Sequence, residues 1–216
     1  HSRVVCQNRI MASPTPRRYA GLSGEQRAAL RRESLLAAGL DVFAAAGRQG
    51  ATMTAICAHA KLTERYFYES FTSRDELLQQ VFDGIVDEVR VAGMAALRTT
   101  EGTREERVRS AIASFVNILT DDPRKGRVAM VESVAYEPLR THRRRALRGF
   151  AQMVADEAAL LYGDRAWPPH QGEINGLLFV GGLAELVTAW LNGEIDITPA
   201  EIVDAATFQF TSTAHR

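Results

Sequence analysis

Cysteine is nearly absent from the 216-residue sequence, which has only Cys6 and Cys57. Neither residue has a C-x-x-C partner, so a disulfide framework and a cysteine-rich metal site are both excluded. Cys57 lies in an apolar helical run, where we expect a small buried side chain. A reducing compartment fits this usage, and we expect a cytoplasmic protein.

Motifs of common active sites are also missing. The sequence has no G-x-S-x-G, Walker or G-x-G-x-x-G pattern. Its five histidines show no metal-ligand spacing. Cys57 and His59 are two residues apart, so on a helix they point to different faces. We therefore expect no catalytic residue, no metal and no cofactor, and we do not expect an enzyme.

Long apolar runs and strand patterns are absent as well. No apolar run is expected to reach the length of a membrane span, and the N-terminus lacks the apolar segment of a signal peptide. We therefore expect no membrane partner. Runs of alternating β-branched residues are not found, and most segments have helical periodicity. The sequence predicts an all-α protein.

Charge is balanced over the whole chain but uneven along it. The chain has 26 basic and 26 acidic residues. Residues 1–75 hold eleven basic and six acidic residues, so their net charge is 11 − 6 = +5, and the remainder carries 15 − 20 = −5. A basic N-terminal part favours a nucleic-acid contact, although chance gives the same modest excess. Only Lys61 and Lys125 are lysines, and arginine is the better bidentate donor to phosphate.

The chain begins with a predicted flexible basic arm, residues 1–23, in which the segment before Met11 is a tag remnant or an upstream start. A first helix is expected over residues 25–46, ending at Gly47. Two short helices follow, which Thr52 and Thr63 can cap. The S-x-x-E capping box of Ser73 and Glu76 begins a longer helix. Later helices are expected near residues 74–98, 104–120, 124–136, 139–163, 169–192 and 198–212.

The second short helix, T-E-R-Y-F-Y-E-S-F, carries four aromatic rings with distinct directions. At about 100° per residue, Phe67 and Phe71 share the buried side. Tyr66 and Tyr68 lie on opposite flanks, and Arg65 points outward. Helices this short need packing to be stable, and the phenylalanines supply it.

An outward arginine at the start of a packed helix favours a DNA recognition helix. The major groove admits an α-helix, and the guanidinium fork matches O6 and N7 of guanine. Arg65 has a second interpretation, an ion pair with Glu69 four residues later. From this stretch alone the two interpretations are equally good.

Residues 50–82, GATMTAICAHAKLTERYFYESFTSRDELLQQVF, resemble the DNA-binding domain of the TetR family of bacterial transcriptional repressors. Thr52, the pair Phe67-Tyr68 and Phe71 match the family pattern. Lys61 stands where the family commonly has Gly, so the turn is either strained by a positive φ or differently shaped. The resemblance implies an N-terminal three-helix domain with a helix-turn-helix at residues 24–72. It also implies a larger helical ligand-binding and dimerisation domain at residues 73–216.

The resemblance further implies a set of DNA-contacting residues and a function. The expected DNA-binding residues are Thr52, Thr63, Glu64, Arg65, Tyr66, Tyr68, Ser73 and Arg74. A homodimer would bind a palindromic double-stranded operator as a repressor and would be released by a small-molecule effector. A helical protein-interaction module without sequence-specific DNA binding is the alternative.

The C-terminal helices predict a dimer seam. Residues 174–191 are apolar almost all round, so this helix must be covered on most sides. Glycines within it let another helix approach closely. The expected interface residues are Leu178, Gly181, Gly182, Glu185, Ile202, Ala206 and Phe210. Completion of the monomer core is the alternative.

The middle helices are expected to hold the ligand pocket for an unknown, apolar effector. The large apolar candidates are Phe115, Met130, Val134, Phe150, Met153 and Phe179. Ordinary core packing is an equally good explanation for each of them. The basic run over residues 140–148 is interpreted first as a solvated helix face and second as a site for an anionic partner.

Overall fold

The computed structural model describes residues 23–214, and the expected basic arm lies outside this part except for Ser23. No β-strand is formed within residues 23–214, and the predicted all-α class is confirmed. The elements are α1 (Gly24–Gly50), α2 (Met53–Ala60), α3 (Glu64–Tyr68), α4 (Arg74–Thr99), α5 (Arg104–Asp121), α6 (Pro123–Gly126), the π-helix η1 (Arg127–Glu132), α7 (Ser133–Ala135), α8 (Glu137–Tyr162), the 3₁₀ turn η2 (Gly163–Arg165), α9 (Pro169–Leu191) and α10 (Pro199–Thr213).

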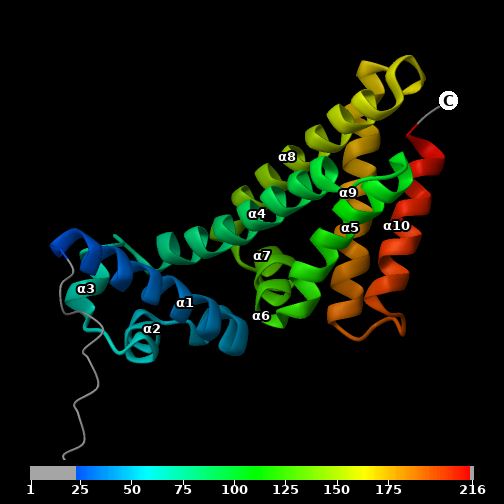
Figure 1. Cartoon of the computed structure of the whole chain (residues 1–216). Coiled ribbons are helices and arrows are strands. Elements are labelled where there is room, and N and C mark those ends of the chain that lie inside the picture. The colour runs from blue at the N-terminus through cyan, green and yellow to red at the C-terminus, as the bar shows by residue number, and fades with distance from the viewer. Residues whose placement is uncertain (1–22, 215–216) are drawn as a thin grey trace, which may run out of the picture.

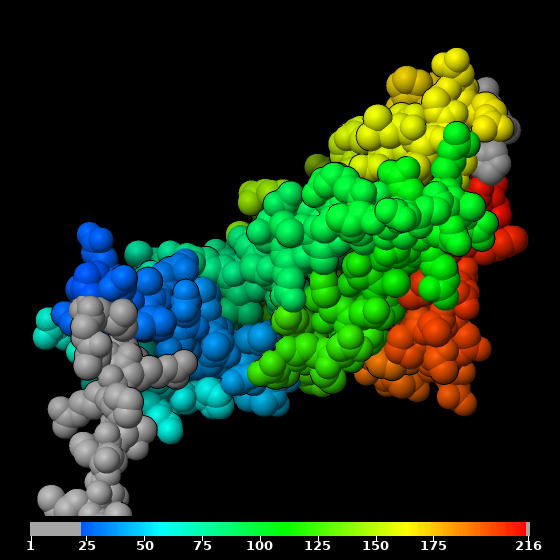
Figure 2. Space-filling view, viewed as in Figure 1, coloured from blue at the N-terminus to red at the C-terminus, as the bar shows by residue number. Residues whose placement is uncertain are grey.

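The helices form a small N-terminal group and a larger body (Figure 1). Helices α1, α2 and α3 pack together at one end, and α4 and α8 run from there along the molecule. In the body, α4 packs on α5, α8 on α9, and α10 on α5 and α9. Figure 2 shows an elongated molecule with the N-terminal helices at one end and the orange and red C-terminal helices at the other.

Most helix boundaries fall close to their predicted positions, although α3 ends at Tyr68 rather than near Phe71, and one predicted helix is divided. The single helix expected over residues 124–136 is instead α6, the π-helix η1 and α7. A π-turn holds more residues than an α-turn, so a reading based on the 3.6-residue period cannot detect it. Gly126 also needs its small size, because an added Cβ would lie 2.2 Å from the carbonyl oxygen of Leu119. The expected stop at Gly47 is present as a kink, with φ 59° and ψ −166°.

The predicted helix caps are partly formed. The side chain of Thr52 accepts a hydrogen bond from the amide of Ala55, and that of Ser73 accepts one from the amide of Glu76. The Glu76 carboxylate, however, accepts from the amide and hydroxyl of Thr72 rather than from the amide of Ser73. Thr63 occupies the cap position of α3 without a side-chain hydrogen bond.

Helix α9 is unusually apolar for an element with so much exposed surface. By length and composition alone it could cross a membrane, so the expectation that no run reaches that length is wrong. Only 22% of its most apolar window is buried inside the protomer. Contiguous exposed apolar surface on a folded protein favours an interaction site.

Helix α4 belongs to both parts of the molecule. Near its start, Leu77 and Leu78 are fully buried, and Leu77 packs over Gly39 of α1, where an added Cβ would lie 2.4 Å from it. Near its end, Val89 and Leu97 are buried in the body. The expected boundary at residues 72–73 therefore falls at the start of a helix that packs against both groups.

A polar cluster fastens the first turn of α4 to the body. The guanidinium of Arg74 donates to the Tyr136 hydroxyl at 2.8 Å and to the Asp75 carboxylate at 3.0 Å. The Tyr136 hydroxyl in turn donates to Asp75. The ring of Tyr136 packs edge-on against Phe43 of α1, with centroids 5.8 Å apart. We call Arg74, Asp75 and Tyr136 the junction cluster.

The junction cluster changes the titration of its members. The hydrogen bond from Tyr136, together with Arg74, lowers the pKa of Asp75. Burial, followed by the hydrogen bond to Asp75, raises the pKa of Tyr136 to about 12. The cluster is therefore strongest with Asp75 charged and Tyr136 protonated.

The substitution Tyr136→Phe is expected to lower the free energy of unfolding by about 1–3 kcal/mol at pH 7, because it removes hydrogen bonds to charged groups. The pKa of Asp75 is lower in the folded than in the unfolded protein. Its contribution is therefore complete above the unfolded value of about 3.9 and is lost as the pH falls through the folded value. Urea unfolding at fixed protein concentration should show the largest difference near pH 7 and a smaller one near pH 3.5.

The matched control is Tyr68→Phe, which removes a hydroxyl from a side chain that is 60% exposed. It should leave the free energy of unfolding unchanged at both pH values. Equal effects of the two substitutions, or a Tyr136→Phe effect that does not vary with pH, would contradict the role given to the junction cluster.

Candidate nucleic-acid interface and ligand cavity

The turn between α2 and α3 is closed by Lys61 in the left-handed conformation, with φ 56° and ψ 38°. The amide of Lys61 donates to the carbonyl of Ala58, and that of Leu62 donates to Cys57, at 3.1 and 3.0 Å. Of the two alternatives for this turn, Lys61 adopts the strained one, and its positive φ costs on the order of 1 kcal/mol in a residue with a Cβ. The two helices thus have the tight connection of a helix-turn-helix.

Helix α3 is held by its phenylalanines, as the helical wheel predicts. Phe67 is fully buried and Phe71 is 2% exposed, with their ring centroids 5.7 Å apart. Tyr68 is exposed, and no hydrogen bond of its hydroxyl is formed within residues 23–214. The predicted separation of buried phenylalanine rings from an outward tyrosine is confirmed for these three residues.

The outward side of α3 carries charged groups. The Arg65 side chain is 82% exposed, and its Nε lies 3.4 Å from Glu69. Glu69 also accepts a hydrogen bond from Arg31 of α1 at 3.2 Å. The ion pair with Glu69 is therefore present, and it leaves most of the Arg65 guanidinium open to solvent. The second flanking ring, Tyr66, is half-buried beneath the Arg31 guanidinium, 4.4 Å from the ring centroid.

The other predicted DNA-contacting residues divide by exposure. Among the eight, Thr52, Thr63, Glu64, Arg65, Tyr68 and Ser73 are exposed. Tyr66 packs against α1, and the Arg74 guanidinium is directed into the junction cluster rather than outward. Glu64 accepts a hydrogen bond from the Thr54 hydroxyl at 3.3 Å. A DNA contact by any of these residues stays a prediction.

The described residues include one cysteine, Cys57, and no metal-binding cluster. They contain no group of three or more His, Cys, Asp or Glu side chains that could hold a metal ion. Cys57 is buried as expected, and burial, followed by the negative charge of Glu64, raises the pKa of its thiol. A raised pKa lowers the thiolate population and makes the thiol a poor nucleophile.

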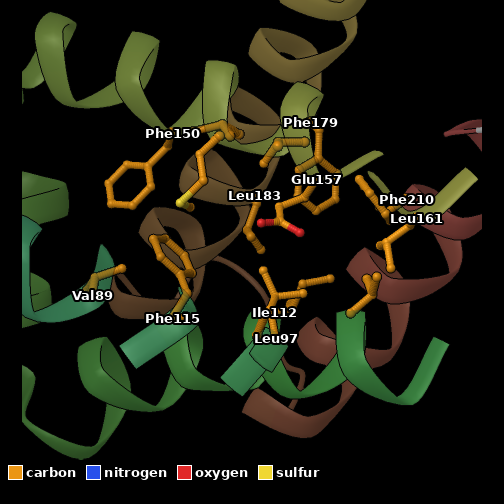
Figure 3. Close-up of a pocket in the computed structure, with 16 residues that line it drawn as sticks. Val89, Leu97, Ile112, Phe115, Phe150, Glu157, Leu161, Phe179, Leu183 and Phe210 are labelled. Atoms are coloured by element: carbon orange, nitrogen blue, oxygen red, sulfur yellow. The ribbon is translucent and has the colours of Figure 1, made fainter. Parts of the chain in front are cut away.

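An apolar cavity lies in the body between α4, α5, α8, α9 and α10 (Figure 3). It contains about 740 Å³ of space free of protein atoms, part of it open to solvent. Its lining residues are Val89, Gly93, Leu97, Val108, Ala111, Ile112, Phe115, Phe150, Met153, Val154, Glu157, Leu161, Phe179, Val180, Leu183 and Phe210.

Four of the six predicted pocket residues, Phe115, Phe150, Met153 and Phe179, line this cavity. Met130 and Val134 do not, and their assignment to the pocket is wrong. Met130 lies in the π-helix η1, and Val134 lies in α7 and is 50% exposed. Both are therefore close in sequence to Tyr136 of the junction cluster and not part of the cavity wall. Glu157 also lines the cavity and was not predicted from the sequence, although it falls in the apolar stripe of α8.

A second hollow adjoins the Phe150 end of the cavity. It shares Phe150 and Met153 with the cavity and adds Arg90, His142 and Arg145. His142 lies 2.9 Å from the carboxylate of Asp83, which also lines the hollow. The basic run of α8 forms a largely exposed face, and its members Arg140, Arg144, Arg145 and Arg148 are exposed. Its first interpretation, a solvated helix face, fits this exposure.

The predicted dimer residues also divide into two groups. On α9, Leu178, Gly181, Gly182 and Glu185 are exposed on one face. An added Cβ at Gly181 or Gly182 would have no neighbour within 4 Å. No other part of the protomer within residues 23–214 covers this face, which carries two further exposed apolar residues, Ile174 and Leu177.

The three predicted interface residues of α10 are instead buried inside the protomer. Ile202 is 0%, Ala206 7% and Phe210 4% exposed. Phe210 packs against Phe179, with ring centroids 5.4 Å apart. Their assignment to the dimer seam is wrong, because that side of α10 completes the core. The outer side of α10 carries Phe208, which is 72% exposed.

Comparison with known proteins agrees with this architecture. The family model described as bacterial regulatory proteins, tetR family, matches residues 35–81. The transcriptional activator FasR of Mycolicibacterium smegmatis, described as of the helix-turn-helix type, is 27% identical over 181 residues. The aligned region spans 83% of this chain and 80% of FasR.

Solved structures share the fold. The regulator FadR of Bacillus subtilis, solved in complex with stearoyl-CoA, has a TM-score of 0.69 and 15% identity, over 85% of this chain and 99% of FadR. A TetR-family regulator of Syntrophomonas wolfei has a TM-score of 0.70 and 12% identity, over 85% of this chain and 94% of its own. With its helix-turn-helix and helical body, the chain is a member of the TetR family of bacterial transcriptional regulators.

Proposed function

We propose that this protein binds operator DNA as a homodimer through α3 and that an apolar molecule in the body cavity controls this binding. The carrying observation is the division of α3 into a fully buried Phe67 and an exposed edge of Arg65 and Tyr68. This edge lies inside the segment that matches the family model, residues 35–81. A packed inner face with polar groups outside is what a recognition helix requires.

The exposed groups suit separate parts of the duplex. Arg65 has the fork that pairs with guanine in the major groove. The Tyr68 hydroxyl and the start of α4 at Ser73 suit phosphates, because helix N-termini attract anions. Tyr66 is given a supporting role instead, since its ring fills space against Arg31. The basic excess in residues 1–75 favours the same partner.

The open face of α9 supports the homodimer. Ile174, Leu177 and Leu178 are 58%, 36% and 67% exposed, and the neighbouring Gly181 and Gly182 leave room for a second helix. A second copy of the same face is the simplest cover, because two-fold interfaces are self-complementary. A dimer would present two α3 helices to a palindrome whose half-sites are about 34–36 Å apart.

The cavity supports an elongated apolar effector. Apart from Glu157, its wall on α8 is apolar from Phe150 to Leu161, a length of about 16 Å at 1.5 Å per residue. The FadR structure carries stearoyl-CoA, so a ligand with a long apolar chain is the first candidate. The hollow with Arg90 and Arg145, next to Phe150, would take a polar head outside the cavity.

Repression is the proposed sign of regulation, with release of DNA when the effector binds. Activation is the second candidate, because the relative FasR is named as an activator. A promoter fusion to a reporter gene, assayed with and without the protein in the bacterial cytoplasm, separates the two. The protein-interaction alternative requires that no duplex is bound specifically.

Selection of sequences from a random duplex pool tests the DNA-binding proposal. The substitution Arg65→Ala should relax the preference at one or two base pairs, by about 1–3 kcal/mol. Tyr68→Phe should weaken binding to all sequences alike, because a phosphate contact carries no base information. Arg98→Ala is the control, since it removes one exposed positive charge at the far end of α4.

Failure of the wild-type protein to enrich any sequence at low salt would favour the protein-interaction alternative. An unchanged preferred sequence in Arg65→Ala would mean that Arg65 serves only the ion pair with Glu69. If Arg65→Ala and Tyr68→Phe lost no more DNA affinity than Arg98→Ala, neither Arg65 nor Tyr68 would make a specific contact with the duplex.

The substitution Leu178→Arg should convert the dimer to a monomer at micromolar concentration, because it places a charge in an apolar seam. Sedimentation velocity measures the change directly. Val91→Arg is the matched control, since Val91 is 52% exposed on α4, outside the α9 face. A wild-type monomer, or a Leu178→Arg variant that is still dimeric, would exclude this seam.

A further inference from the structure

The apolar cavity contains a single charged side chain. Of its sixteen lining residues, Glu157 is the only one with a polar side chain, and the others are aliphatic, aromatic, methionine or glycine. A carboxylate in such walls contributes nothing to hydrophobic packing. Its presence calls for a partner that the lining itself does not supply.

Glu157 is placed in the cavity by the register of α8. Met153, Glu157 and Leu161 follow one another at four-residue spacing, so they share one face of the helix, and all three line the cavity. Figure 3 shows the carboxylate directed into the space among Ile112, Phe179 and Leu183. Asp156, one residue earlier, is exposed and lies outside the lining.

No protein group neutralises this carboxylate. Within residues 23–214, Glu157 forms no hydrogen bond and no ion pair. No arginine is among the lining residues of the cavity, and Arg90 of α4 and Arg145 of α8 line the neighbouring hollow instead. An apolar ligand that filled the cavity would remove water from the carboxylate without replacing its hydrogen bonds, which is unfavourable.

We propose that Glu157 is the specificity-determining residue of the cavity and that the effector carries a hydrogen-bond donor, best a protonated amine, on an apolar body. The inference rests on the proposed ligand control and names the chemistry of the ligand. A cationic donor forms a charge-assisted hydrogen bond with the carboxylate and pairs with its charge. A plain saturated chain, or an anionic group at this depth, meets an unpaired negative charge.

The position of Glu157 also restricts the shape of the ligand. It lies seven residues after Phe150 and four before Leu161 on α8, or about 10 Å and 6 Å along the helix axis. The cavity therefore has apolar walls on both sides of the carboxylate. A ligand whose donor reaches Glu157 can extend its apolar body toward Phe115 and Phe150, the larger side.

Three probes of equal chain length separate the chemistries: dodecylammonium, 1-dodecanol and dodecanoate. Calorimetry below their aggregation concentrations, with the full-length protein, should rank the wild-type affinities in that order. Glu157→Gln keeps the size and removes the charge, and it should weaken dodecylammonium binding by about tenfold to a hundredfold. Glu157→Leu should bind dodecanol more tightly than the wild type and should abolish the preference for the cation.

The control is Asp156→Asn, which removes a neighbouring carboxylate that does not line the cavity and should leave the ranking unchanged. A wild-type protein that binds dodecanoate as tightly as it binds dodecylammonium would overturn the inference. So would a ranking that survives both Glu157 variants. Binding of none of the three probes would overturn the proposed ligand control itself, whereas binding without preference would overturn only the role of Glu157.

Discussion

The packing of one long helix against both parts of the molecule is the constraint on which the structure depends. Helix α4 has 26 residues, about 39 Å at the rise of an α-helix. Its start is fixed to the N-terminal group by Leu77, packed over Gly39, while its later turns supply Val89 and Leu97 to the cavity wall. In the proposed mechanism α4 moves as a unit, so that a displacement at the cavity is transmitted to the N-terminal helices.

The junction cluster fixes how the N-terminal group is oriented relative to the body. Arg74 and Asp75 are in the first turn of α4, and Tyr136 precedes α8, the helix that carries Glu157. The N-terminal ends of α4 and α8 thus meet at one hydrogen-bonded point beside Phe43 of α1. Polar contacts of this type have strict geometry, so they favour a defined angle between the N-terminal group and the body. In the proposed mechanism, a ligand that wedges α4 from α8 changes this angle.

Much of the fold could be predicted from the sequence, because local signals and burial agree. The caps at Thr52 and Ser73 and the buried pair Phe67 and Phe71 follow from spacing alone. The π-helix over residues 127–132 could not be predicted, because its number of residues per turn differs from the 3.6 of an α-helix. The buried side of α10 was assigned to a dimer because periodicity shows that a face is apolar but does not show what covers it. Glu157 was overlooked for a related reason: a single carboxylate in an apolar stripe becomes meaningful only once the stripe is known to line a cavity.

The central claim is that the cavity and the DNA-binding helix share one mechanical element. The direct measurement is the affinity of the protein for a specifically selected duplex, with and without a saturating ligand whose occupancy of the cavity is verified by calorimetry. The account predicts that the DNA dissociation constant changes by at least about fivefold, the lower end of typical coupling between sites. An unchanged dissociation constant with the cavity fully occupied would contradict it.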